Sequence, residues 1–173
     1  TVEQKENLNI VIDGNDYDLT GTITIDGNSR YYDSETLTIK NINFYTDKAS
    51  GYFINGIYVD STTRYPHNVT IENCDFISTY VEANGVENKF GAINMHQAVN
   101  INVYNVTANG VHSLLQAKGV ANLTVDGAVV NAEKGISLGT SVNATIKNIE
   151  INSNDYGIRA DGNASRGNLI VKN

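Results

Sequence analysis

The sequence predicts an all-β protein folded as a parallel β-helix, in which short strands wind into stacked rungs. Three observations predict it: a short phrase that recurs along the chain, alternation of apolar and polar residues within each copy, and a turn-forming residue at the end of each copy. The copies are Leu37–Asn41, Val69–Asn73, Ile101–Asn105, Leu123–Gly127, Ala144–Asn148 and Leu169–Asn173.

The last residue of each copy is suited to a tight corner. Five of the six copies end in Asn, and the fourth ends in Gly127. These two residue types most readily adopt the left-handed backbone conformation that a one-residue corner needs. A second asparagine column precedes the copies and is expected to hold further turn residues; it consists of Asn68, Asn100, Asn122, Asn143 and Asn168.

Each rung is expected to contain three strands. In the first copy Leu37 and Ile39 point to one face while Thr38 and Lys40 point to the other, which is the period of a strand with one buried face. A second apolar pair follows each corner, and a third strand precedes the next copy. The inward pairs expected in this third strand are Ile23/Ile25, Ile57/Val59, Ile93/Met95, Leu115/Ala117, Ile136/Leu138 and Ile158/Ala160.

The spacing of the copies sets the length of a rung. The central residues Ile39, Ile71, Val103, Val125, Ile146 and Val171 stand 32, 32, 22, 21 and 25 residues apart. A regular rung therefore takes about 22 residues, and the first rungs carry long loops. We expect one β-helix domain over residues 1–173. Because Thr1 is not a native start, we expect this domain to be part of a longer or processed protein.

The corner asparagines give the chain a family resemblance. Through Asn41, Asn73, Asn105 and Asn148 it resembles the pectate-lyase-like superfamily of right-handed parallel β-helices, over roughly Leu8 to Asn173. The run Ile12–Gly21 also looks like openings common in adhesin-like and NosD-like members. The resemblance implies a right-handed, single-stranded helix whose corner asparagines form a hydrogen-bonded ladder. It does not specify function, because the superfamily includes lyases, hydrolases, epimerases, phage tailspikes and adhesins.

Bulk properties exclude some classes of protein. The net charge of −7 argues against non-specific binding to nucleic acid or to an anionic membrane. No apolar run approaches the roughly 18 residues that a membrane-spanning helix needs. The single Cys74 excludes an internal disulfide, and its place in an apolar column predicts a buried small hydrophobe rather than a nucleophile.

The long loops of the N-terminal half are the expected place of function. Gly27–Thr36 and Ser61–Asn68 lie on one flank of the third strand, and Tyr45–Asn55 and Ile77–Gly91 lie on the other. Eight of the ten tyrosines fall within residues 17–80, and their polar-tipped rings suit sugars, although packing of the loops is an alternative role. The expected ligand-binding residues are Tyr31, Tyr32, Tyr58, Arg64, Tyr65, Asn94 and Gln116.

One row of titratable residues is a candidate catalytic site. The expected register places Asp26, Asp60, His96 and Lys118 side by side on the outer face of the third strand, and Thr24, Tyr58, Asn94 and Gln116 in the next row. Two carboxyls about 5 Å apart suit a retaining glycosidase, and His96 or Lys118 suits the base of a polysaccharide lyase. The superfamily's hydrolase motifs, a paired DD, GHG and RIK, are absent. The alternative is a solvated strand face with compensating charges.

Metal and cofactor chemistry has little support in the sequence. His67 and His112 show no metal-ligand spacing and are interpreted as turn or surface residues. No cofactor is expected, with Ca²⁺ implied only if the protein is a lyase.

The favoured hypothesis is a secreted or cell-surface bacterial module that binds a polysaccharide or surface glycan through the N-terminal loop groove, with no catalytic activity assigned to it. The alternatives are a polysaccharide lyase or glycoside hydrolase, and a structural spacer of a bacterial adhesin. The unpaired edge of the last copy, Leu169–Asn173, also predicts end-to-end or edge self-association.

Overall fold

The computed structural model describes residues 9–26, 35–57, 68–96, 98–139, 143–160 and 168–172. The regular structure in these ranges is all β-strand. The strands are β1 (Asn9–Thr20), β2 (Ile23–Asp26), β3 (Thr36–Thr46), β4 (Ser50–Ile57), β5 (Asn68–Ser78), β6 (Lys89–His96), β7 (Asn100–Lys118), β8 (Asn122–Leu138), β9 (Asn143–Ala160) and β10 (Leu169–Lys172). In this part of the chain no helix is long and apolar enough to cross a membrane.

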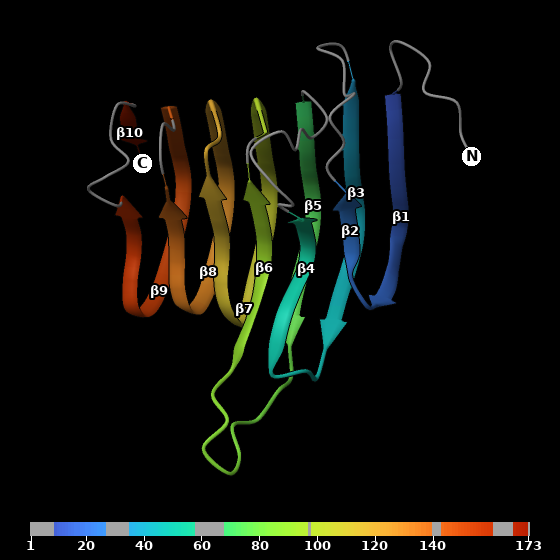
Figure 1. Cartoon of the computed structure of the whole chain (residues 1–173), viewed down its shortest axis with the longest axis vertical. Helices are drawn as coiled ribbons and strands as arrows, with labels where there is room; N and C mark the ends of the chain where they lie inside the picture. Colours follow the sequence, from blue (N-terminus) through green and yellow to red (C-terminus); the bar gives the residue numbers. More distant parts are fainter. Residues whose placement is uncertain are drawn as a thin grey trace.

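The strands stack as the rungs of a helix (Figure 1). One wall runs through β1, β3, β5 and β7, another runs through β2, β4, β6 and β7, and β8, β9 and β10 follow in order. All the pairings between these strands are parallel. The fold is a right-handed parallel β-helix, as the sequence predicts.

The rungs differ between the two halves of the chain. In the C-terminal half, β7, β8 and β9 each run through a whole rung as one bent strand. In the N-terminal half each rung is divided in two, as β1/β2, β3/β4 and β5/β6. The loop between β5 and β6 extends well beyond the stacked strands (Figure 1).

The corner asparagines adopt the predicted conformation and form the predicted ladder. Asn41, Asn73, Asn105 and Asn148 have φ values of 53°, 52°, 51° and 50°. Nδ2 of Asn73 donates to Oδ1 of Asn41 at 3.3 Å, and Nδ2 of Asn105 donates to Oδ1 of Asn73 at 3.4 Å. At the next rung the ladder is interrupted by Gly127, which has a φ of 76°.

An aspartate replaces the missing amide where the ladder stops. Nδ2 of Asn148 donates to Oδ1 of Asp126 at 2.7 Å, and Lys147 pairs with the same carboxylate at 3.0 Å. The hydrogen bond from Asn148 is the main cause that lowers the pKa of Asp126, and Lys147 adds to it. Asp13 plays the same part at the first rung, with Asn41 at 3.0 Å and Lys40 at 3.3 Å.

The second asparagine column is a ladder as well. Nδ2 of Asn100 donates to Oδ1 of Asn68 at 2.7 Å, and Nδ2 of Asn122 donates to Oδ1 of Asn100 at 2.9 Å. At the C-terminal end the backbone N–H of Asn168 donates to Oδ1 of Asn143 at 3.1 Å. The sequence predicts only turn residues in this column. The hydrogen bonds between its side chains are a feature that the sequence does not predict.

The third-strand register agrees with the expectation in the regular rungs and differs at β4. The partners Ile93, Leu115, Ile136 and Ile158 stack as expected. In β4, however, the partner of Ile23 is Ile54, and not Ile57 as expected from the alternation of Ile57 and Val59. The expected inward position of Ile57 is therefore wrong, because Ile54, three residues earlier, takes that place in the register.

Aromatic packing explains this register. Phe53 and Ile54 are both fully buried. The Phe53 ring lies 5.6 Å from Phe44, 5.8 Å from Phe76 and 4.8 Å from Phe90, measured between ring centroids. Burial of the Phe53 ring among three other phenylalanines removes a large apolar surface from water and adds aromatic contacts, which stabilises this register.

Cys74 lies in the core, as predicted, and is 1% exposed. Burial raises the pKa of its thiol to about 11. The thiol is therefore protonated at neutral pH and packs as a small apolar group.

The ladder makes a prediction about stability. Asn73→Ala removes both the amide and the tolerance of positive φ, and should lower the free energy of unfolding by about 2 kcal/mol. Asn73→Gly keeps the conformation, as Gly127 does naturally, and should cost about 1 kcal/mol or less. Urea unfolding measures both variants. A Gly variant no more stable than the Ala variant would show that the corner conformation is not the main constraint.

Candidate functional site

The outer face of the third strand carries a row of amides. Asn55 of β4, Asn94 of β6 and Gln116 of β7 are register partners on successive rungs. Nδ2 of Asn94 donates to Oδ1 of Asn55 at 2.9 Å. The row continues with Ser137 and Arg159. The two expected ligand-binding residues within the described ranges, Asn94 and Gln116, are thus neighbours.

The β4 register changes the rest of the expected site. Asn55, and not Tyr58, is the partner of Asn94, and Ile57 is the residue opposite Asp26. The expected pairing of Asp26 with Asp60 is replaced by that of Asp26 with Ile57, and Asp60 itself lies outside the described residues. The remaining expected residues lie outside the described ranges: Tyr31, Tyr32, Tyr58, Asp60, Arg64 and Tyr65.

His96 and Lys118 do stand together as register partners, two residues beyond Asn94 and Gln116 on the same strands. Nε2 of His96 lies 3.1 Å from Oδ1 of Asn94. Burial is the main cause that lowers the pKa of His96, and the charge of Lys118 lowers it further. The imidazole is therefore held neutral near neutral pH, beside a cation.

Tyr52 borders the amide row, although the sequence pattern alone does not distinguish it from the other tyrosines. Its register partner is Gly91, and a Cβ at Gly91 would stand 2.6 Å from the Tyr52 ring. The ring therefore occupies the space that a side chain at Gly91 would fill. Burial raises the pKa of the Tyr52 hydroxyl, while a hydrogen bond with Gln116 acts against that rise. Gly91 is the sequence signal that could have identified it.

A second aromatic residue lies beyond Gln116. Tyr156 lies on β9, and its charge, when the phenol is ionised, adds to the raised pKa of Tyr52. The guanidinium carbon of Arg159 stands 5.7 Å from the Tyr156 ring centroid. This surface, which we call the amide face, thus consists of Asn55, Asn94 and Gln116 between Tyr52 and the Tyr156–Arg159 pair.

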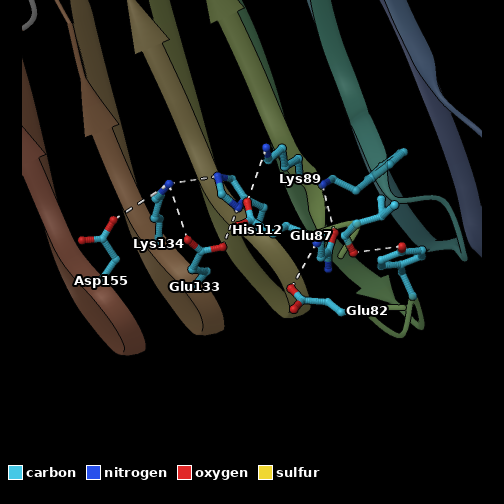
Figure 2. Close-up of polar contacts among 11 residues, drawn as sticks. Glu82, Glu87, Lys89, His112, Glu133, Lys134 and Asp155 are labelled. Carbon is cyan, nitrogen blue, oxygen red and sulfur yellow. Dashed lines mark hydrogen bonds and ion pairs between the residues drawn. The ribbon is translucent and has the colours of Figure 1, made fainter. Parts of the chain in front are cut away.

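A separate polar cluster lies on the next corner of the rungs (Figure 2). Nδ1 of His112 lies 2.8 Å from Oε2 of Glu133, and its Nε2 lies 3.2 Å from Nζ of Lys134. Lys134 also approaches Glu133 at 3.6 Å and Asp155 at 3.9 Å. An ammonium group has no lone pair, so Nε2 of His112 accepts and Nδ1 carries the proton donated to Glu133.

This arrangement corrects the interpretation of His112 as a turn or surface residue. Its side chain is 15% exposed and both ring nitrogens are engaged. The lone pair that a general base would use is occupied by Lys134, so His112 positions its neighbours. The register columns of the corner, Val111–Ala132 and Ser113–Lys134, could have indicated the cluster only if the bulge at this place had been foreseen.

The described residues contain no set of side chains suited to bind a metal ion. Within the described ranges, no group of three or more His, Cys, Asp and Glu side chains could hold a metal ion.

Comparison with known proteins adds no assignment. No protein-family model matches the chain, and neither a curated protein nor a solved structure matches it. The curled sheet of parallel strands and the asparagine ladder are compatible with the pectate-lyase-like resemblance. Membership of that superfamily stays a prediction.

The environment of His96 makes a prediction about pH. Its folded pKa lies below the ordinary value of 6.5, so its contribution to stability is complete above about pH 6.5 and is lost as the pH falls below it. Titration of the imidazole by NMR should give a midpoint below 6.5, and Lys118→Met should raise it because a like charge is removed. A midpoint at or above 6.5 in the unmodified chain contradicts this assignment.

Proposed function

We propose that this protein is a carbohydrate-binding β-helix module, secreted or displayed on a cell surface, that holds a polysaccharide or glycan on its amide face. The observation that carries the proposal is the amide row Asn55–Asn94–Gln116 bordered by the Tyr52 ring. Successive rungs repeat every ~4.8 Å, so the row is a linear array of polar groups that suits an extended chain molecule.

The chemistry of the face suits sugars. Side-chain amides both donate and accept hydrogen bonds, as a row of sugar hydroxyls requires. The half-buried Tyr52 offers an apolar ring and a polar tip to the same ligand. Lys118 adds positive charge beside Gln116, two residues further along β7, and Arg159 adds it at the β9 end of the row, which favours sugars that carry carboxylates.

The proposal does not include catalysis. A glycosidase needs two carboxyls at close range, and the residue opposite Asp26 is the apolar Ile57. Binding without turnover requires only the amides and the aromatic ring.

Tyr52→Ala should weaken binding of an oligogalacturonate or neutral oligosaccharide about 10-fold, because an aromatic contact is worth up to about 1.5 kcal/mol. Gln116→Ala should weaken it by a similar factor. Tyr104→Ala is the matched control, since Tyr104 belongs to the strand wall shared by β5, β7 and β8. Titration calorimetry over a panel of polysaccharides measures these effects. Equal affinities for all three variants, or no binding to any polysaccharide, would refute the proposal.

A further inference from the structure

A groove of about 780 Å³ lies at the corner between the second and third strands of β7, β8 and β9, beside the loop that joins β5 to β6. We call it the bulge groove, and the residues that matter in it are Glu82, Asn88, Asn109, Asn131, Glu133 and Asn152. It is separate from the amide face.

A backbone irregularity opens the groove. Asn109, Asn131 and Asn152 are register partners, and Nδ2 of Asn152 donates to Oδ1 of Asn131 at 3.1 Å. The register then shifts between Asn109 and Val111, where Gly110 has a φ of 68°. The side-chain amide of Asn109 has no hydrogen-bond partner among the described residues. The bulge therefore leaves the side-chain amide at the end of this short ladder available to a ligand.

The bulge also fixes one wall of the groove. Nδ2 of Asn88 donates to the carbonyl oxygen of Gly110 at 2.7 Å, and the backbone N–H of Asn88 donates to Oε1 of Glu82 at 3.1 Å. The loop turns at Asn84 and Gly85, whose φ values of 56° and 73° suit a tight hairpin turn. Glu82 is therefore held at the groove before any ligand arrives.

The opposite wall is equally constrained. Glu133 is held by His112 at 2.8 Å and by Lys134 at 3.6 Å (Figure 2). The groove is thus lined by two carboxylates and several amides, and no lysine or arginine side chain lines its described part. Lys134 pairs with Glu133, whereas Glu82 forms no ion pair with the described residues, so an anionic ligand would be repelled chiefly by Glu82.

We infer that the bulge groove is a second saccharide site, specific for uncharged sugars. Carboxylates accept hydrogen bonds from hydroxyl groups, and the Asn109 and Asn131 amides can donate to ring and hydroxyl oxygens. The ligand class rests on the proposed function, whereas the site and its charge preference are independent of the amide face.

Side-chain and backbone amide signals in NMR titrations test the inference on the full chain, with neutral glucose, mannose and galactose hexasaccharides and with hexagalacturonate as probes. We expect a neutral hexasaccharide to shift the signals of Asn109, Asn131 and Asn152, and hexagalacturonate to leave them unchanged. Glu82→Ala should weaken the neutral sugar about 5- to 10-fold. Glu87→Ala, on the same loop and paired with Lys89 outside the groove, is the matched control.

The outcomes separate the two sites. Shifts at Asn94 and Gln116 with none in the groove for any neutral probe would overturn the inference and leave the proposed function standing. Groove shifts without any change at Asn94 and Gln116 would support the inference and overturn the amide-face proposal. Preference of the groove for hexagalacturonate, or equal effects of Glu82→Ala and Glu87→Ala, would also overturn the inference.

Discussion

Hydrogen bonds between parallel strands of successive rungs stack each side chain directly on the equivalent side chain of the next rung. This stacking requires the backbone to turn at the same place in every rung, and the turn needs a positive φ. Asparagine meets both requirements, because it tolerates the conformation and its amide bonds to the asparagine of the neighbouring rung. Where the amide is missing, Asp126 and Asp13 supply an acceptor and a lysine of the next rung balances the charge.

Much of this arrangement could be predicted from the sequence. The repeated phrase predicted the fold, the corner asparagines and the burial of Cys74, because each depends on local pattern alone. The β4 register could not be read in the same way. Alternation of Ile57 with Val59 suggested one register, while the consecutive buried residues Phe53 and Ile54 belong to a bend that alternation does not describe. Packing of four phenylalanines decided the outcome.

The candidate sites also divide into residues that the sequence pattern predicts and residues that only the packing places. Asn94, Gln116, His96 and Lys118 were placed correctly relative to one another because β6 and β7 are regular. Tyr52 was not selected, since its position depends on the absent side chain of Gly91, one rung away. The cluster around His112 was missed because the bulge at Gly110 moves the register by one residue, and a bulge leaves no trace in the apolar pattern. Regular stacking thus gives the scaffold, and its local exceptions give the two surfaces proposed to bind sugars.

The central claim is that the β4 register, set by Phe53 and Ile54, builds the amide face. Cysteine pairs test it directly, because a disulfide forms only between residues whose Cα atoms are roughly 4.4–6.8 Å apart. Mild oxidation followed by mass spectrometry of the Asn55→Cys/Asn94→Cys and Tyr58→Cys/Asn94→Cys double variants decides between the two registers. The account predicts a disulfide in the first pair and none in the second. A disulfide only in the second pair would contradict it.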